Sequence, residues 1–457
     1  MQRLRFLAAL WAGKLAALAI RLLARGRGTN LPGSLALKID PLFLQHLRGT
    51  DPARTVFVTG TNGKSTTTNL LAHMFERAGY RLAVNRQGAN LTPGIATSLI
   101  AHTSPFGRVR ADLILMEADE RFLPITAGQL RPGHLCVTNL QKDQVQRNGA
   151  PDIIYDKLRQ VIRRDTVLYL NNEEPSAGSL RALAERTVTF GVEQNDKSFQ
   201  KPGPLTTTVP CPFCSQPIRF DVYNVDNVGP FCCTGCGYAS SPRPDCLVAD
   251  VDYENGRFSV DGDPYPFGYA TPYFLYCYSA AVAIARAFGL PPAVIASACA
   301  DFVNIGGRFE RFALGDKTVQ YIRMKQENPE TLQSAINHIA ADPAPKIVVL
   351  GLGEIRDDYP YYTNTFYTYD CDFERLEASE VTRYLCFSDT VCYDSAIRLR
   401  YAGVPEERIC IVPSNDGREV LRALDRQQGS NVYLITLLRV FEELVAAAKG
   451  LAGAAEG

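Results

Sequence analysis

The sequence has no excess of either charge: its 457 residues include 48 Lys and Arg and 48 Asp and Glu. Proteins that attract nucleic acid through their overall field carry a surplus of positive charge, so this balance excludes a nucleic acid partner of that kind. A local basic pocket for phosphate remains compatible with it. With 46% hydrophobic and 21% charged residues the composition is that of an ordinary globular protein, and the length predicts two or three domains.

The sequence also lacks a long apolar run free of charge. Residues 7–23 are apolar and flanked by arginines, as in a signal peptide or a membrane span, but Lys14 and Arg21 interrupt them. Each charge at the centre of a span costs about 2.5–3.5 kcal/mol, and no small-residue cleavage site follows. The favoured interpretation of residues 1–50 is an amphipathic segment that docks on the protein or on the inner surface of the cell membrane; a true span is the alternative.

A disulfide framework is absent from the cysteine pattern. Of the 13 cysteines, four form two tight pairs within one segment, and others are scattered through apolar stretches. The scattered residues are Cys136, Cys277, Cys299, Cys386, Cys392 and Cys410. This distribution indicates one metal site and small buried residues in a reducing compartment, which predicts a cytoplasmic protein.

Short β-branched runs alternate with helical patterns. The expected strands are 55–59, 81–85, 112–116, 134–138 and 166–170, with helices over 64–79 and 152–164 between them. Such alternation predicts an α/β fold in which helices cover both faces of a parallel sheet.

The pattern changes twice along the chain. Proline, cysteine and glycine accumulate in residues 205–245, which predicts an inserted module, and a helix over 273–289 then completes a central domain of residues 51–310. A second alternating unit, with strands at 346–351, 384–387, 409–412 and 431–436, predicts a smaller Rossmann-like α/β domain over 311–457. This unit lacks a dinucleotide fingerprint, because Gly351-Leu352-Gly353 is not followed by a third glycine.

A phosphate-binding loop follows the first strand. The segment Gly60-Thr61-Asn62-Gly63-Lys64-Ser65-Thr66 joins a buried strand to a helix start. Glycines let backbone N–H groups approach phosphate oxygens, and the helix N-terminus adds partial positive charge. Lys64 supplies a cation to the β- and γ-phosphates, and the Ser65 hydroxyl is a ligand for Mg²⁺. The generic loop would place glycine at position 58, where this chain has valine; the variant string is that of the Mur ligase superfamily.

Polar residues follow two further strands. Glu117 comes directly after the strand expected at 112–116, and Asn139 and Asp143 follow the strand expected at 134–138. Carboxyl ends of parallel strands face the ligand crevice, so Glu117 is predicted to bind Mg²⁺ and Asn139 to help form the nucleotide site. A solvated acidic cluster is the alternative for Glu117.

Two CxxC pairs lie in the insertion. Cys211 and Cys214 are followed after eighteen residues by Cys233 and Cys236. This spacing is typical of a zinc ribbon, in which four thiolates complete a tetrahedral shell and leave no position for substrate. We expect a structural Zn²⁺; Cys232 is the alternative to Cys233.

Taken together, the loop, the four-cysteine ribbon and Gly307-Arg308-Phe309-Glu310 resemble the MurT family, the synthetase subunits of lipid II isoglutaminyl synthase. Segments near residues 31–41 and 369–374 are similar too, so the resemblance covers nearly the whole chain. It implies a Mur ligase central domain followed by a MurT-like C-terminal domain, with ATP and Mg²⁺ as cofactors and Arg308 among the nucleotide-binding residues.

The resemblance implies an amidation. MurT-like enzymes use ATP to phosphorylate the α-carboxylate of D-glutamate in the lipid II stem peptide, and ammonia then displaces the phosphate. The ammonia comes from a GatD-type glutamine amidotransferase subunit, and nothing in this chain resembles a glutaminase nucleophile elbow. The aspartate by which the family completes the partner's catalytic triad falls on Asn364 here; Asp357 and Asp358 lie a few residues upstream and are the alternatives. The family's Asn-Pro-Ala-Gly loop is replaced by Asn-Pro-Glu-Thr at 328–331.

Two other functions fit the same motifs. A stand-alone Mur-type amino-acid ligase would take an amino acid in place of ammonia. A non-catalytic nucleotide-binding scaffold would hold a glutaminase without using Lys64.

Overall fold

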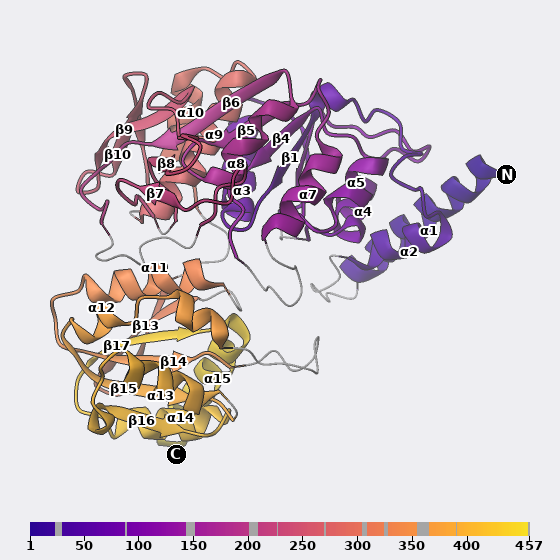
Figure 1. Cartoon of the computed structure of the whole chain (residues 1–457). Helices are drawn as coiled ribbons and strands as arrows, with labels where there is room; N and C mark the ends of the chain where they lie inside the picture. The colour runs from indigo at the N-terminus through magenta and orange to yellow at the C-terminus, as the bar shows by residue number, and fades with distance from the viewer. Residues whose placement is uncertain are drawn as a thin grey trace. The chain divides into compact units, whose positions relative to one another are not determined.

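The computed structural model describes residues 1–22, 30–86, 89–142, 151–200, 209–225, 227–268, 271–303, 309–323, 328–353, 365–389 and 391–455. The chain divides into two compact units (Figure 1). Unit 1 comprises Met1–Gln141 and Asn148–Ile305, and unit 2 comprises Lys142–Arg147 and Gly306–Gly457.

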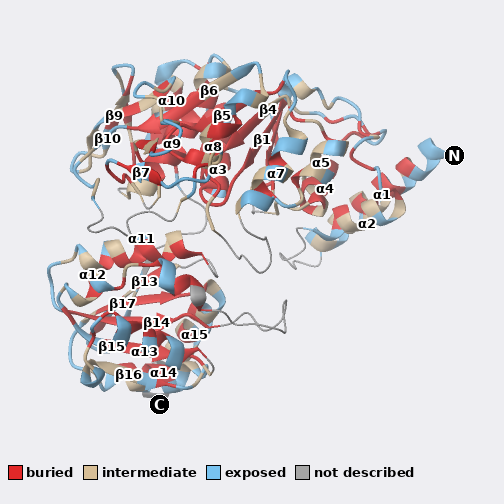
Figure 2. Ribbon diagram, in the orientation of Figure 1, coloured by how far each residue is buried: buried red, intermediate tan, exposed pale blue. Residues whose placement is uncertain are grey.

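Unit 1 is built on a nine-stranded sheet of order β11-β10-β9-β6-β5-β4-β1-β3-β2. Neighbours from β2 to β9 are parallel, and β10 and β11 add an antiparallel edge. The strands are β1 (Thr55–Thr59), β2 (Leu82–Val84), β3 (Leu113–Glu117), β4 (His134–Val137), β5 (Val167–Asn171), β6 (Arg186–Val192), β9 (Cys246–Asp252), β10 (Arg257–Val260) and β11 (Asp263–Pro266). Every residue of β1, β3 and β5 is buried, as expected for central strands of a sheet covered on both faces (Figure 2).

Helices cover the two faces of this sheet with separate apolar clusters. Along β1, Val56 and Val58 belong to one cluster and Phe57 to the other, because successive strand residues point to opposite faces. The first cluster packs under α3 (Lys64–Arg77), α9 (Pro272–Ala287) and α10 (Pro292–Ala300). The second packs under α1 (Gln2–Leu22), α2 (Leu31–Ile39), α4 (Thr92–Ala101), α5 (Leu123–Gln129), α7 (Pro151–Val161) and α8 (Pro175–Ser179).

The inserted module between β6 and β9 carries a two-stranded antiparallel hairpin, β7 (Ile218–Phe220) and β8 (Phe231–Cys233). Its small core contains Phe220, Tyr223 and Phe231 together with two of the paired cysteines.

Unit 2 contains a six-stranded sheet of order β12-β13-β17-β14-β15-β16, parallel except for the β12–β13 hairpin. Its strands are β12 (Phe309–Leu314), β13 (Lys317–Arg323), β14 (Lys346–Gly351), β15 (Val381–Phe387), β16 (Ile409–Val412) and β17 (Asn431–Thr436). One face is covered by α11 (Pro329–Ala340), α12 (Glu374–Glu377) and α13 (Cys392–Tyr401), the other by α14 (Gly417–Asp425) and α15 (Leu438–Ala455).

The α/β fold class predicted from the sequence is confirmed: all nine predicted strands are present, within three residues of the expected bounds. The pattern did not predict β6, the antiparallel edge β10–β11 or the β12–β13 hairpin. None of the helices that the structure describes is both long and apolar enough to span a membrane.

Candidate functional site

The glycine loop leaves β1 at Thr59 and enters α3 at Lys64. Gly60 and Gly63 both have left-handed backbones, with φ of +118° and +84°. A Cβ atom on Gly60 would lie 2.4 Å from the Thr138 hydroxyl and 2.8 Å from the Asn139 carbonyl. Glycine is therefore required at position 60 for two reasons. The backbone has a conformation that other residues rarely adopt, and it lies too close to the end of β4 to leave space for a side chain.

The segment after β4 holds the loop in place. β4 pairs in parallel with β1, which brings Asn139 against the loop. The Asn139 carbonyl accepts from Thr61 N–H at 2.8 Å, and its side chain accepts from Asn62 N–H at 2.9 Å and donates to the Asn62 carbonyl at 3.0 Å. The Thr138 hydroxyl also donates to the Asn62 carbonyl, at 2.7 Å. Asn139, predicted to be a nucleotide-binding residue, thus lies beneath the loop and fixes its shape.

Helix α9 supports the loop from another side, a role that no motif in the sequence predicts. The Tyr273 hydroxyl accepts from the Asn139 amide at 3.0 Å. A Cβ on Gly63 would meet Cys277 Sγ at 3.1 Å and the Tyr273 hydroxyl at 3.3 Å. Residues more than 200 positions after the loop therefore set the space in which it lies.

Lys64 is buried at the first turn of α3. Its ammonium group donates to the carbonyls of Gly60 and Thr61 and forms a 2.9 Å ion pair with Glu120, which is buried too. A buried ammonium needs such partners, because its desolvation would otherwise be very costly. The sequence placed Glu120 in an acidic segment but did not identify it as the partner of Lys64, since no local pattern joins residues 56 positions apart.

Glu117 ends β3 beside the loop. β3 pairs with β1 in the register Val58↔Glu117, and the Glu117 side chain is buried. The Asn85 side chain binds both its backbone N–H and its carbonyl, at 2.8 Å each, and the Asn90 amide donates to its Oε1 at 3.2 Å. These contacts orient a carboxylate at the carboxyl edge of the sheet.

Of the two hydroxyl residues that follow Lys64, Ser65 is exposed and Thr66 is buried. The edge thus combines a loop of backbone N–H groups, an ammonium group, an exposed hydroxyl and two carboxylates. This set of groups fits a nucleoside triphosphate with Mg²⁺, which requires oxygen ligands for the metal and N–H donors for the phosphates.

The four paired cysteines come together in the insertion. The Sγ atoms of Cys211, Cys214, Cys233 and Cys236 lie within 4.8 Å of one another, with 3.6 Å between Cys211 and Cys236 and 3.4 Å between Cys214 and Cys233. These separations are too long for disulfides and close to the ~3.8 Å edge of a tetrahedron with Zn–S bonds of ~2.3 Å. The group can hold a metal ion, and Cys233, not Cys232, is its member.

The cysteine turns have the geometry of metal-binding knuckles. Backbone N–H groups of Gly235 and Cys236 point at Cys233 Sγ from 3.3 and 3.4 Å, and that of Phe213 points at Cys211 Sγ from 3.5 Å. The N–H groups of Cys236 and Gly235 lower the pKa of Cys233 to about 6, whereas burial raises the pKa of Cys211 to about 12. Hydrogen bonds of this kind favour the thiolate, which is the form that binds metal.

A buried carboxylate joins the insertion to the rest of unit 1. Glu173, just after β5, accepts from Val192 N–H at 2.9 Å, from the Asn224 amide at 3.2 Å and from the Tyr276 hydroxyl. Burial raises the pKa of Glu173 to about 7. Its neighbour Glu174 accepts from Leu140 N–H at 3.0 Å and caps α8, and burial raises its pKa to about 7 as well.

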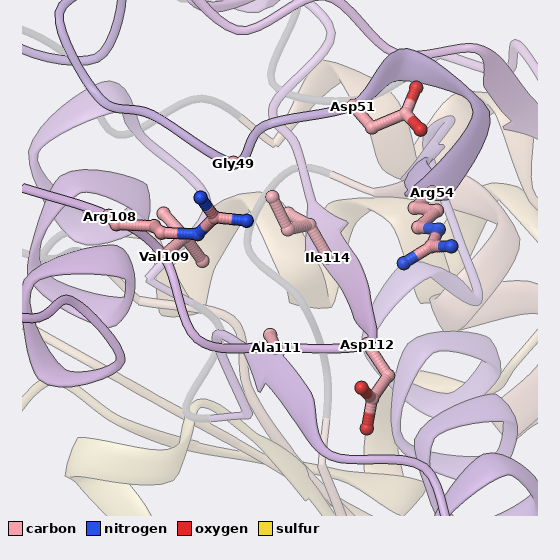
Figure 3. A pocket seen from close by; sticks show the side chains of 8 residues that line it. All are labelled: Gly49, Asp51, Arg54, Arg108, Val109, Ala111, Asp112 and Ile114. Atoms are coloured by element: carbon pink, nitrogen blue, oxygen red, sulfur yellow. The ribbon is translucent and has the colours of Figure 1, made fainter.

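A cavity of about 340 Å³ lies at the opposite edge of the sheet from the loop (Figure 3). Arg54 and Asp112 immediately precede β1 and β3, and Arg108 and Asp51 complete its charged lining. Charges of both signs line the cavity, and Asp112 is already paired with Arg81 at 2.8 Å. It is not part of the predicted nucleotide site.

Three predicted site residues, Arg308, Asn364 and Asp357, lie outside the described residues, as do Asp143 and Asp358. Their roles stay predictions.

Two family models match the chain. The Mur ligase middle domain matches residues 58–208, which contain the glycine loop, Glu117 and Asn139, and the MurT ligase C-terminal domain matches residues 326–437.

Curated relatives align along most of the chain. Lipid II isoglutaminyl synthase (glutamine-hydrolyzing) subunit MurT from Streptococcus pneumoniae is 28% identical over 92% of this chain and 93% of its own length. The subunit of the same name from Staphylococcus aureus (strain COL) is 25% identical over 87% of this chain and 88% of its own.

Solved structures share the fold at lower identity. A pseudomurein peptide ligase type C from Methanothermus fervidus has a TM-score of 0.65 at 16% identity, covering 90% of this chain and 80% of that one. MurF from Acinetobacter baumannii has a TM-score of 0.60 at 13% identity, covering 91% and 80%.

Proposed function

Because this chain is a Mur-type ligase that resembles the MurT subunits over nearly its whole length, we propose that it amidates a carboxylate at the expense of ATP. The substrate of the proposed reaction is the α-carboxylate of D-glutamate in the stem peptide of lipid II, and the product is D-isoglutamine. The observation that carries the proposal is the loop from Gly60 to Lys64, held by the ends of three parallel strands beside the buried carboxylate of Glu117.

The proposed reaction has two steps. A carboxylate oxygen attacks the γ-phosphorus of ATP, so that ADP leaves and an acyl phosphate forms. Ammonia then attacks the acyl carbon, inorganic phosphate leaves, and the resulting ammonium centre loses a proton to give the amide. Activation is needed because an ionised carboxylate is a poor electrophile without a leaving group.

The residues of the loop have defined parts in this proposal. Backbone N–H groups at the end of the loop and the start of α3, from Gly63 to Thr66, bind phosphate oxygens, because Asn139 already accepts from the N–H groups of Thr61 and Asn62. Lys64 exchanges its carbonyl partners for the β- and γ-phosphates, where it neutralises the charge that develops during transfer. Ser65 and Glu117 would hold Mg²⁺, which would supply further charge neutralisation to the phosphates when bound. Arg308 is proposed as an additional nucleotide contact.

The insertion is proposed to hold a structural Zn²⁺ on Cys211, Cys214, Cys233 and Cys236. A closed four-thiolate site has no position for substrate, so its proposed role is to stabilise the insertion. The distances between the sulfur atoms and the N–H groups directed at them support this assignment.

Ammonia is proposed to come from a GatD-type glutaminase subunit, with Asn364 or Asp357 near its catalytic triad. We place the reaction in the cytoplasm, where ATP is available and where the cysteines outside the proposed zinc cluster remain reduced.

The test is a reconstitution of the purified chain with a GatD-type glutaminase, lipid II, ATP, Mg²⁺ and glutamine, followed by mass spectrometry of the stem peptide. We expect replacement of the carboxyl OH by NH₂, and the same product when ammonium chloride replaces glutamine and the glutaminase. Lys64→Ala should lower the rate about 100-fold or more, whereas Lys157→Ala on α7 should leave it unchanged.

Other outcomes would select the other functions. Consumption of ATP with an amino acid and no need for ammonia would favour a stand-alone ligase. Unchanged amide formation by the Lys64→Ala variant would favour a scaffold.

A further inference from the structure

Helix α1 presents an apolar face to solvent. Its outward residues are Leu4, Trp11, Leu15, Leu18 and Leu22, with exposed fractions of 72%, 47%, 60%, 53% and 77%. Their spacings of seven, four, three and four residues place them on one side of the helix, and the exposed Ala8 and Ala19 fall between them. This outward stripe is ~27 Å long at 1.5 Å per residue. Contiguous apolar surface of this kind is unusual on a protein exposed only to water.

The stripe is outward because the opposite face of α1 is fixed to the protein. Phe6, Ala9, Leu10 and Gly13 are buried, and the Phe6 ring stacks on that of Phe43 with 5.4 Å between the centroids. Lys14 donates to the carbonyls of Ile100 and Thr103 at 3.1 and 2.6 Å, at the end of α4. The charge that interrupts the apolar sequence thus anchors the helix, as a cation at a helix C-terminus does.

The charged side chains of α1 itself are all basic, and Arg5 lies 4.0 Å from the buried Asp40 beyond the helix. Residues 1–39 contain seven Lys and Arg and no Asp or Glu, although the whole chain is balanced at 48 of each. Arg3 and Arg21, both exposed, each stand one residue before a stripe leucine, so they border the stripe about a quarter turn around the helix.

We infer that α1 is an interfacial membrane anchor, whose outward stripe lies among the lipids of an anionic bilayer surface. An apolar helix face bordered by arginines and lacking acidic residues is what such a surface binds. If the stripe packed on the stripe of a second copy, the arginines beside the two stripes would lie close together. Repulsion between these like charges disfavours self-association. The helix does not cross the bilayer, because its other face is packed on α2 and α4.

The anchor belongs to the same unit as the nucleotide loop. Gly33 of α2 packs so closely on α4 that a Cβ there would lie 1.9 Å from the Pro93 carbonyl. Asn90, which precedes α4, donates to Glu117. Bound through α1, the unit would keep the edge with Glu117 at a fixed height above the lipid surface. That a fixed height would help the enzyme reach a lipid-linked substrate rests on the proposed function. The binding of α1 to the lipid surface does not depend on that function.

Trp11 is the only tryptophan of the chain and lies in the stripe, so its fluorescence reports on the helix directly. The intact protein, without ATP, is titrated with vesicles of phosphatidylcholine alone or of phosphatidylcholine with phosphatidylglycerol. We expect a blue shift of the emission and co-sedimentation with the anionic vesicles, both weakened by salt, and at least tenfold weaker binding to the neutral ones. No blue shift and no co-sedimentation with anionic vesicles would overturn the inference.

A double variant distinguishes binding through the stripe from non-specific hydrophobic binding. Leu15→Glu with Leu18→Glu should weaken vesicle binding at least tenfold, whereas Ile125→Glu, a change at an exposed apolar residue of α5, should not. Circular dichroism and the thermal midpoint verify that each variant is folded. A dimer of the wild-type chain that the double variant abolishes, without any vesicle binding, would assign the stripe to self-association and overturn the inference.

A separate assay tests whether membrane binding through α1 assists amidation of a lipid-linked substrate. The double variant should amidate a soluble stem peptide at the wild-type rate and lipid II in vesicles more slowly. If neither protein amidates either substrate while the wild type still binds vesicles, the proposed function fails and the anchor stands.

Discussion

Lys64 shows how one residue combines a stability requirement with a functional one. Its ammonium group is buried and is held by two loop carbonyls and the Glu120 carboxylate. Removing one member of a buried ion pair leaves the other uncompensated, which is more costly than the pair's net contribution. Loss of Glu120 would therefore disturb the position of Lys64 as well as the stability of the loop.

At Glu173 the buried carboxylate makes stability depend on pH. Burial raises its pKa from 4.5 to about 7. Between these values the unfolded chain loses the proton while the folded protein keeps it, so stability falls as pH rises from 4.5 to 7 and then levels off. The loss from Glu173 is about 3 kcal/mol. Glu173→Gln should remove that part of the decline in thermal midpoint between pH 5 and 8.

The exposed Glu193 provides the control for this measurement. Glu193→Gln should retain the wild-type slope, and a Glu173→Gln variant with that same slope would contradict the buried titration. Glu174, whose pKa is raised to about 7 too, keeps a residual slope in both variants.

Gly60 and Gly79 offer a second comparison between single residues. Both have left-handed backbones, with φ of +118° and +86°, but a Cβ on Gly60 would lie within 3 Å of three atoms, whereas one on Gly79 would meet nothing within 4 Å. Gly79→Ala should cost about 1–2 kcal/mol of stability. Gly60→Ala should cost more and should lower the amidation rate about 100-fold, since the loop must shift. Equal rates in the two variants would show that the close packing of Gly60 is irrelevant to the site.

At the scale of elements, the loop depends on parts that are distant in the sequence. The ends of β1, β3 and β4 meet because the strands pair in parallel, and α9 closes the space beside Gly63 through Tyr273 and Cys277. Several elements must therefore be in place before the loop has its shape.

The β7–β8 hairpin and its cysteine turns form the element that metal removal should affect. If the cluster holds the proposed zinc, the wild type should contain one zinc per chain, and Cys233→Ser should lower this content and lower the thermal midpoint of unit 1 by at least ~5 °C. Cys232→Ser is the matched control, because Cys232 adjoins the cluster without belonging to it. Equal zinc content in the two variants would exclude the proposed ligand set.

At the scale of the whole molecule, the two units have separate apolar cores on either side of two sheets. Separate cores predict two unfolding transitions in calorimetry. A chelator should lower the transition of unit 1, which contains the cysteine cluster.

A non-hydrolysable ATP analogue with Mg²⁺ should raise that same transition. At 100 times its Kd the ligand adds about 2.7 kcal/mol. A single unfolding transition would contradict the independent unfolding of the two units. A shift confined to the transition that the chelator leaves unchanged would contradict nucleotide binding at the loop of unit 1.

Features that depend on neighbouring residues could be predicted from the amino-acid sequence. Runs such as Val56-Phe57-Val58 predict buried strands because nearly every position must be apolar in a sheet covered on both faces. The glycine loop and the CxxC turns were recognisable for the same reason, since each needs a few residue types at fixed short spacing.

Contacts between distant residues could be established only from the three-dimensional fold. It paired Lys64 with Glu120, set Tyr273 against Asn139, and joined Glu173 to Asn224 and Tyr276 across the insertion. The fold also determines that the outward stripe of α1 faces solvent, although the sequence of that helix is apolar on several sides. A hydrogen bond or an ion pair depends on where folding places two side chains, and the spacing of residues along the chain does not contain that information.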